Sequence, residues 1–491
     1  MRVADLAILS AALVPACGCG DTGTHGQADA GDDADDPWTV DGPCAGCDDG
    51  NPCTMDLCNL ETGRCAILPL DLDGDLHISI VGTDGTTFCG GDDCDDTRAD
   101  VYPGAPEVCL DGVDQDCDTV VDGPVVMGSE VRVTESDEAS IDVRIAWTGE
   151  EYALVWVERD AESSDSTLEL ARLDPLGATL GRSTLDDHCD GRPSPRLPAL
   201  AWSGSRLGLC WSAYSSIQFA QVGLDGVEDG STSLLPLGRT CRIAWTGSEY
   251  GLASVYYDSM SLAAVDATGA VTWSASTIAA PDTGRIDDYA LGIAWTGSRL
   301  AAAWGEWVEA ESGWGDWNIW LATAAPGSTE PLEPVQVTEV IYALWPDIVW
   351  TGSEIGMAFE YPVPYAYLER LGPAGEVLGP PVRINDSGFF AGRPRISWTG
   401  SVFGVAWMGG LEASSAPAFR LATPDAEPLG DAITLTEARG CTHLPDLAWT
   451  GSEFGVAWQD SRHDEVDRCD LYSSWPDDNW EIYFARVGMC E

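Results

Sequence analysis

The chain has 491 residues, 44% of them hydrophobic, and a formal net charge of −57, so it has ample material for a large core. It contains no lysine, and its 81 acidic residues far outnumber its 24 arginines. Such a surface repels nucleic acid and anionic lipid and favours bound cations. We therefore exclude nucleic acid as a partner, although acidity is also typical of proteins from saline habitats and does not by itself establish a metal site.

Residues 1–19 have the features of a lipoprotein-type signal segment. One basic residue precedes a short apolar run, Leu6 to Ala16, as in export signals. The following "VPAC" resembles a bacterial lipobox, which implies that Cys17 is lipidated. No other apolar stretch reaches the roughly 18 residues that a membrane span needs. We expect a secreted protein, or a lipoprotein of the outer membrane or cell surface, that touches the membrane only through its lipid.

Two changes of composition divide the rest of the chain. Residues 20–43 are acidic and small, with almost no aliphatic side chains to offset the entropy of ordering, and we expect a disordered linker. Residues 44–122 are rich in cysteine and aspartate, which indicates a small disulfide-rich metal-binding module. From 123 to 491 the composition changes to aromatic and β-branched residues, and this part forms a second domain.

The cysteines are predicted to form disulfides. Sixteen remain if Cys17 is acylated, an even number that suits an oxidising compartment. We expect the two short pairings Cys89 with Cys94 and Cys109 with Cys117. Upstream, "CAGCDDGNPCTMDLC" is similar to cysteine-rich modules of exported myxobacterial proteins. Its CxxC motif is open to a redox or zinc interpretation, but the density of cysteines favours a disulfide knot.

Aspartates recur at alternate positions between residues 71 and 122. Alternation in a turning loop directs several oxygens at one point, which suits the six to eight oxygen ligands of Ca²⁺, and crowding these charges without a cation is costly. The alternative is a solvated acidic loop held by disulfides. The candidate ligands are Asp71, Asp73, Asp75, Asp92, Asp93, Asp95, Asp96, Asp100, Glu107, Asp111, Asp114, Asp116, Asp118 and Asp122.

The order of the motifs in this segment carries a family resemblance. "DLDGD", "GDDCDDTRADVYPGAPEVC" and "DGVDQDCD" follow one another, and the segment resembles the MopE-type metal-binding motif of bacterial surface proteins, in which Gly stands where this chain has Leu76. The resemblance implies an exported protein that binds a metal, copper in the namesake. Copper prefers softer donors, and the segment offers His77 alone, so we expect calcium, with copper as the alternative.

The domain from 123 to 491 contains seven copies of one motif, written "WTGSEFGVAW" in the last copy. Each copy has an apolar strand ending in Trp, a Thr-Gly or Ser-Gly turn and a second apolar strand. Runs such as 168–177 and 381–386 add a third and a fourth strand. Four strands in about 50 residues are typical of a propeller blade. The first tryptophans of the copies are Trp147, Trp202, Trp245, Trp295, Trp350, Trp398 and Trp449.

The ends of this domain predict how it closes. The last copy stops after its third strand, at 481–488, and an unmatched strand, 130–136, precedes the first copy. If these two strands pair, the ring is complete and has no exposed edge, whereas an open solenoid needs polar caps. We therefore expect an all-β protein with a seven-bladed β-propeller of four-stranded blades, in which the N-terminal strand closes the last blade. The repeated tryptophans are expected to pack between blades.

Catalytic motifs are missing: the sequence has no HExxH, GxSxG, phosphate-binding or dinucleotide-binding pattern. We expect a monomeric, non-enzymatic platform for an unknown protein or polysaccharide at the cell surface, contacted through variable connections such as 306–318 and 459–480. The alternative is a propeller glycoside hydrolase, similar to sialidases, that uses the N-terminal module as an anchor. Clustered carboxylates at the channel mouth favour the enzyme, and a smooth channel lined by Gly, Ala and Val favours the platform.

Overall fold

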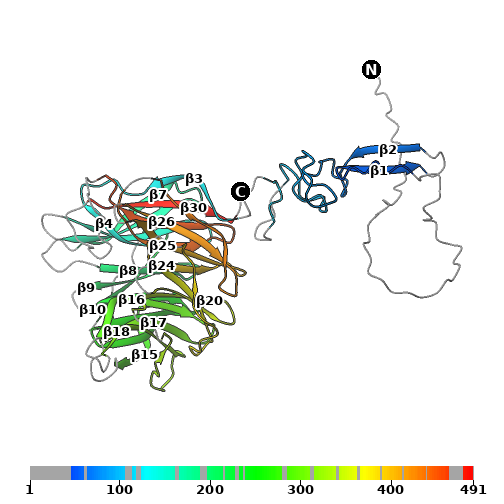
Figure 1. Cartoon of the computed structure of the whole chain (residues 1–491). Helices are drawn as coiled ribbons and strands as arrows, with labels where there is room; N and C mark the ends of the chain where they lie inside the picture. Colours follow the sequence, from blue (N-terminus) through cyan, green and yellow to red (C-terminus); the bar gives the residue numbers. More distant parts are fainter. Residues whose placement is uncertain are drawn as a thin grey trace, which may run out of the picture. The chain divides into compact units, whose positions relative to one another are not determined.

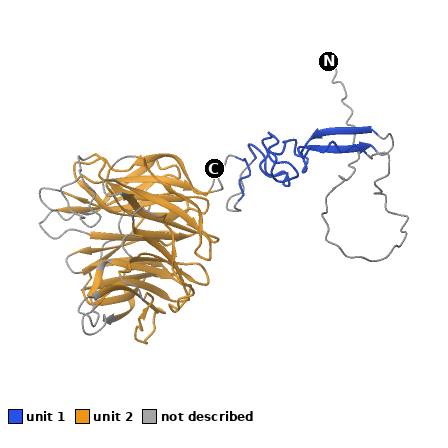
Figure 2. Cartoon of the chain, viewed as in Figure 1, with its two compact units in different colours: residues 1–108, 113–121 blue, residues 109–112, 122–491 orange. Residues whose placement is uncertain are grey.

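A computed structural model of the chain shows two compact units, residues 1–108 with 113–121 and residues 109–112 with 122–491 (Figure 2). The predicted signal segment, the linker and Cys17 lie outside the described residues. No helix long and apolar enough to cross a membrane occurs among the residues described. The structure describes residues 46–59, 64–105, 113–117, 123–160, 165–187, 196–213, 216–226, 232–235, 238–278, 285–309, 315–338, 342–361, 365–386, 390–411, 414–437, 440–463 and 479–489.

Within its described residues, the first unit contains one regular element, a hairpin of β1 (Thr54–Asn59) and β2 (Arg64–Pro69) (Figure 1). The acidic segment after β2 is organised by two isolated bridges, which join Val81 to Phe88 and Ser79 to Asp93. Gly91 is needed where this segment folds back, because a Cβ atom there would lie 1.9 Å from the Ile78 carbonyl oxygen. This unit is therefore held by short turns and disulfides rather than by an extended sheet.

The second unit consists of seven four-stranded antiparallel sheets, as expected for a seven-bladed propeller. The first three blades are β4 (Ala139–Trp147), β5 (Tyr152–Arg159), β6 (Ser166–Leu173) and β7 (Thr179–Asp187); β8 (Arg196–Trp202), β9 (Leu207–Ala213), β10 (Ser216–Val222) and β11 (Thr232–Leu235); and β12 (Thr240–Trp245), β13 (Tyr250–Tyr256), β14 (Ser259–Val265) and β15 (Val271–Ile278).

The remaining blades continue in chain order, and the seventh takes its outer strand from the start of the domain. They are β16 (Arg285–Trp295), β17 (Leu300–Glu309), β18 (Gly315–Ala324) and β19 (Val335–Gln336); β20 (Leu344–Trp350), β21 (Ile355–Glu360), β22 (Ala366–Leu371) and β23 (Val382–Arg383); β24 (Phe390–Trp398), β25 (Phe403–Leu411), β26 (Ser414–Ala422) and β27 (Pro428–Thr434); and β28 (Thr442–Trp449), β29 (Phe454–Asp460), β30 (Glu481–Gly488) and β3 (Val125–Arg132).

The ring closes through this shared blade, so the predicted closure by an N-terminal strand is confirmed. β3 pairs antiparallel with β30, with Val126 opposite Val487 and Arg132 opposite Tyr483. The strand begins five residues earlier than the run 130–136 from which it was predicted. The first strands of neighbouring blades contact one another around the full circle, β28 with β4 included. These first strands therefore line the axis.

The repeated Thr-Gly turn has the same hydrogen bonds in each blade. In the first copy the Thr148 hydroxyl accepts from the Glu151 amide at 3.1 Å and donates to the Glu151 carbonyl at 2.8 Å. Between them Gly149 has a φ of 100°, which a residue with a Cβ atom rarely adopts. Equivalent bonds form at Thr246, Thr351 and Thr450, so the side-chain hydroxyl explains why Thr or Ser recurs before the glycine.

The glycine of the second strand leaves room for a side chain of the next blade to pack closely against it. A Cβ atom on Gly208 would lie 2.2 Å from the ring of Tyr250, which begins the second strand of the following blade. The same contact joins Gly455 of the last blade to Tyr152 of the first, where the distance would be 2.3 Å. The later tryptophans of the repeat are buried, with Trp156 and Trp458 at 0% exposure, as expected of packing residues. The first tryptophans are only partly buried, and Trp147 packs on Tyr152 of its own hairpin with ring centroids 4.7 Å apart.

Candidate metal centre

Each aspartate of the first acidic run uses one oxygen to shape the loop. The Gly74 amide donates to Asp71 Oδ1 at 2.7 Å, the Asp75 amide to Asp73 Oδ1 at 3.2 Å and the His77 amide to Asp75 Oδ1 at 2.7 Å. Turns of this kind form because an aspartate side chain reaches amides two or three residues ahead. The loop is thus wound around the aspartates, with one oxygen of each left for another partner.

Two overlapping carboxylate groups result, and they share Asp73. Asp71, Asp73 and Asp75 form one group, while Asp73, Asp93 and Asp96 form the other; in each, one oxygen per residue lies within 4.8 Å of the others. Asp93 and Asp96 are only 1% and 7% exposed. Among the described residues, the buried Oδ2 atoms of Asp73, Asp75, Asp93 and Asp96 have no hydrogen-bond partner.

This arrangement is electrostatically unfavourable without a cation. Burial, reinforced by the charges of Asp73 and Asp75, raises the pKa of Asp93 to about 6. Burial likewise raises the pKa of Asp73 and of Asp96, and neighbouring carboxylates add to both shifts. Buried acceptors without hydrogen-bond donors cost folding free energy. A bound cation would remove this cost, so the geometry favours a cation site.

The donor atoms of the two carboxylate groups are all of one chemical kind. All the converging atoms are carboxylate oxygens, the ligands that Ca²⁺ prefers. His77 is the one imidazole of the segment, and it stacks on Tyr102 with ring centroids 5.0 Å apart, while its Nδ1 lies 3.5 Å from Asp92 Oδ2. It belongs to neither carboxylate group. The donor set therefore fits a hard cation better than copper, which favours nitrogen and sulfur.

The other predicted ligands lie apart from this centre or beyond the described residues. The side chain of Asp92 is 62% exposed, Asp95 Oδ1 accepts from the Thr97 hydroxyl at 2.6 Å, and Asp100 pairs with Arg98 at 2.6 Å. Asp114 and Asp116 join neither carboxylate group. Those outside the described residues are Glu107, Asp111, Asp118 and Asp122.

Leu76 occupies a position that suits glycine. Its φ is 84° and it is 88% exposed, so the side chain makes little contact that could offset the backbone strain. This is the residue at which the MopE-type motif has Gly. A glycine here, as in the motif, would adopt this conformation without strain.

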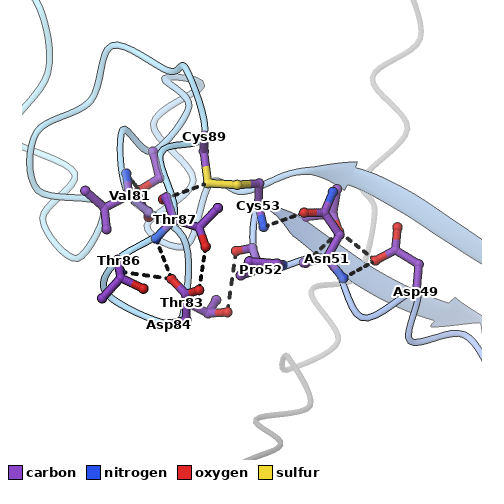
Figure 3. The surroundings of a disulfide bond; sticks show 12 residues. Asp49, Asn51, Pro52, Cys53, Val81, Thr83, Asp84, Thr86, Thr87 and Cys89 are labelled. Atoms are coloured by element: carbon purple, nitrogen blue, oxygen red, sulfur yellow. Dashed lines mark hydrogen bonds between the residues drawn. A yellow bond between two sulfur atoms is a disulfide. The ribbon is translucent and has the colours of Figure 1, made fainter.

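Both predicted cysteine pairings are wrong. Cys89 is bonded to Cys53, and Cys94 is bonded to Cys117; Cys109 lies outside the described residues. The hairpin closed by the Val81–Phe88 bridge docks on Pro52, whose carbonyl accepts from the Thr83 amide at 2.9 Å, and this brings Cys89 to Cys53 (Figure 3). Spacing along the sequence could not predict this, because the pairing depends on the path of the folded chain.

A further acidic group was not predicted from the sequence. Asp48, Asp49 and Asp56 bring oxygens within 4.8 Å of one another beside the β1–β2 hairpin. Asp49 Oδ1 already accepts from the Asn51 amide at 2.8 Å and from the Thr54 hydroxyl at 3.0 Å. The only signal for it is the "DDGNPCTMD" run, which reads equally well as a turn.

Comparison with known proteins agrees with the geometry of the centre. Residues 93–123 match the Cu-binding_MopE family model, described as "Putative metal-binding motif". The chain carries a MopE-type metal-binding motif. That match contains Asp93 and Asp96, whereas Asp71, Asp73 and Asp75 precede it. A search of curated proteins finds no match.

Solved structures with a similar fold are distant in sequence. The β-propeller domain of the Trilobed protease from Pyrococcus furiosus is 10% identical, with a TM-score of 0.44 and coverage of 73% of this chain and 97% of that one. Pyrococcus horikoshii acylaminoacyl peptidase is 10% identical (TM-score 0.39, coverage 70% and 52%). Trypanosoma rangeli sialidase in complex with the inhibitor DANA is 9% identical (TM-score 0.39, coverage 74% and 59%). This chain thus spans little more than half of the latter two proteins, and we infer no activity from these likenesses.

Proposed function

We propose that this protein is an exported surface protein that binds Ca²⁺ through its Asp-rich loops and presents its propeller as an interaction platform. The main support for the calcium site is that oxygens of Asp73, Asp93 and Asp96 converge within 4.8 Å of one another. Their buried Oδ2 atoms have no hydrogen-bond donor among the described residues. Asp71 and Asp75 extend the donor set. A Ca²⁺ ion would complete these bonds and cancel the repulsion.

Calcium would act by ordering the module. The two runs that supply the ligands, 71–75 and 93–96, are joined by a Leu72 amide that donates to Asp96 Oδ1 at 2.9 Å and by the Ser79–Asp93 bridge. A cation between them adds a cross-link of the kind that small disulfide-rich units use in place of a large core. We propose that the loops between residues 71 and 105 are stable only with the metal bound.

The propeller suits a binding role because its two faces differ. The Thr-Gly turns that join first to second strands are short and uniform, and antiparallel pairing places them all on one face. The connections at the opposite face, such as those between β5 and β6 or β29 and β30, vary in length along the sequence. Variable loops on a rigid scaffold are where partners bind, and we propose a protein or polysaccharide partner there.

Disulfides support an oxidising compartment. Cys210 and Cys241 join β9 to β12 of the next blade, and both are fully buried. Together with Cys47–Cys65 and the two pairs of the acidic segment, they favour export. We propose that lipidation of Cys17 then holds the protein at the cell surface.

Isothermal titration calorimetry of the full-length protein with CaCl₂ tests the calcium site. We expect saturable binding in the millimolar range or below. Asp93→Asn and Asp96→Asn should each weaken binding by at least about tenfold, since each removes a charged ligand from the shared centre. Asp258→Asn, at an exposed turn of the propeller, is the control for loss of one negative charge and should bind like the wild type.

The same titration with CuSO₄ separates the two metals. The calcium proposal is overturned if Ca²⁺ shows no saturable binding, or if Cu²⁺ binds in a way that excess Ca²⁺ does not displace. Equal loss of binding in Asp258→Asn would also contradict it, because the effect would then come from net charge rather than from ligands.

A further inference from the structure

Charged residues of both signs occupy the first strands of the propeller, where we expected from the sequence either clustered carboxylates or small apolar walls. The position three residues before each repeat tryptophan is arginine in blades one, three and six, aspartate in blades five and seven, and Ala or Gly in the other two. These residues are, in blade order, Arg144, Ala199, Arg242, Gly292, Asp347, Arg395 and Asp446. Because the first strands line the axis, this position forms one layer around it.

The two aspartates of this layer are largely engaged elsewhere. Asp347 Oδ2 accepts from the Ile396 amide and Asp446 Oδ2 from the Ile145 amide, both at 3.0 Å. Their Oδ1 atoms lie 3.7 and 3.9 Å from nitrogens of Arg395. Each aspartate therefore links its own strand to the next blade by a hydrogen bond, and its charge also acts on Arg144 and Arg242.

Arg144 differs from these two aspartates. It is 5% exposed, and its Nε and Nη1 atoms have no hydrogen-bond acceptor among the described residues. Burial and then the charge of Arg395 lower its pKa to about 10. Arg242, 7% exposed, donates to the Cys241 carbonyl at 2.9 Å, and burial followed by the charges of Arg144 and Arg395 lowers its pKa. Three buried guanidinium groups thus repel one another.

These arginines share a cavity with apolar walls. It is lined by Arg144, Arg242, Arg393 and Arg395, and by Leu197, Trp345 and Leu444 with two prolines, and none of the acidic residues that the structure describes lines it. Leu197, Trp345, Arg393 and Leu444 all lie two positions before the charged layer at bulges of their strands, with φ between 49° and 51°. Non-glycine residues with positive φ are strained, and bulges redirect side chains. The bulges therefore determine how these four side chains are placed.

We propose that this axial cavity binds the carboxylate of a small organic acid. Guanidinium groups match the planar, two-oxygen geometry of a carboxylate, and the leucine and tryptophan walls suit its carbon chain. Asp142, Asp347 and Asp446 act on these arginines from outside the lining, and the buried Glu360 acts on Arg393. A carboxylate in the cavity would supply the hydrogen-bond acceptor that Arg144 lacks among the described residues. The proposal is independent of the calcium site.

Calorimetric titration of the full-length protein at fixed Ca²⁺ and constant ionic strength tests it, with sodium acetate and sodium propionate as probes and sodium chloride and sodium sulfate for comparison. We expect saturable binding of both carboxylates, with propionate at least as tight as acetate. Arg144→Gln should weaken binding by at least about tenfold, the size expected for one charge-assisted contact. Arg299→Gln, an exposed arginine that donates to Thr323, is the matched control and should bind normally.

Thermal unfolding of the same variants distinguishes a lost ligand contact from a damaged fold. Because Arg144 is a buried charge whose Nε and Nη1 have no hydrogen-bond acceptor among the described residues, Arg144→Gln should melt at the wild-type temperature or above in carboxylate-free buffer, and should no longer be stabilised by propionate. The proposal is overturned if Arg144→Gln melts lower than the wild type, if it still responds to propionate, or if chloride or sulfate matches the carboxylates.

Discussion

Buried acidic residues of this protein differ in what they touch, and the difference decides whether they stabilise it. Glu158 accepts from the Trp156 indole at 2.7 Å and pairs with Arg182 at 3.0 Å, so its charge is compensated. Glu369, on β22, is 3% exposed and its Oε2 has no hydrogen-bond partner among the described residues. Burial alone raises the pKa of Glu369 to about 7. Its ionised form therefore opposes folding.

This predicts a pH-dependent effect of Glu369→Gln. The unfolded chain ionises at the ordinary glutamate pKa of 4.5, while the folded protein keeps the proton until about pH 7, so the contribution of Glu369 to stability falls as pH rises through that window. Glutamine cannot ionise, so the variant should match the wild type near pH 4.5 and be more stable by up to about 3 kcal/mol above pH 7.

Urea unfolding of both proteins at pH 4.5 and pH 8 measures this difference. Glu333→Gln, at an exposed position between β18 and β19, controls for the loss of one carboxylate and should show the same stability difference at both pH values. A Glu369→Gln variant less stable than the wild type at pH 8 would mean that the carboxylate has a compensating partner.

At the scale of the strand, the residues of the repeat motif pack each blade against the next. The small residue of each second strand receives the first aromatic or aliphatic side chain of the next second strand, as in Gly251 against Leu300 and Gly404 against Phe454. The aromatic residue is in turn packed by the tryptophan before the turn, with ring centroids 4.7 Å apart for Trp449 and Phe454. The motif therefore couples a hairpin to its neighbour, which explains why its letters recur together.

Gly455→Ala tests this packing at the interface between the last blade and the first. A Cβ atom there would lie 2.3 Å from the ring of Tyr152, so the ring must move and the two blades must separate. We expect a loss of about 1–3 kcal/mol, typical of overpacking a buried site. Gly379→Ala adds a methyl group where no described atom lies within 4 Å and should be nearly neutral in the same urea experiment. Equal losses in the two variants would refute this packing role of Gly455.

For the whole molecule, the sequence predicted the architecture better than the sites. Seven tryptophan-turn copies and one unmatched strand were enough for the blade number and the closure, because each blade repeats the same local chemistry. The axial arginines were missed, since Arg144, Arg242 and Arg395 share their position with Ala199 and Gly292 and no recurring letter marks them. They meet only because the ring brings distant strands together. The cysteine pairings failed for the same reason.

The metal ligands could be predicted from the sequence only in part. Alternation along 71–75 marked the loop, and the "DDCDD" run marked Asp93 and Asp96. Periodicity could not tell these from Asp92, Asp95 and Asp100, whose side chains bond to neighbours or face solvent. Which carboxylates converge depends on the Ser79–Asp93 bridge, a contact that only the folded chain makes.

One buried carboxylate joins the two strands that close the ring. Glu481, at the start of β30 and 0% exposed, pairs with Arg132 at 2.8 Å and accepts from the Thr134 hydroxyl and, at 3.0 Å, from the Ser136 amide. All three donors belong to β3 or the residues after it. Glu481→Ala would leave them without this acceptor, and we expect a loss of about 3 kcal/mol or more, as when one partner of a buried ion pair is removed.

The control for this change is Glu135→Ala, because Glu135 approaches the same arginine at 3.6 Å with a side chain that is 86% exposed. Exposed ion pairs contribute little, so this variant should unfold at the urea concentration of the wild type. Limited proteolysis adds a local readout, since release of β3 in Glu481→Ala should expose residues 125–136 to cleavage before the blades unfold. If the two alanine variants are equally stable and equally resistant, the closing strand is held by its backbone pairing with β30 alone, and the buried carboxylate has no part in closing the ring.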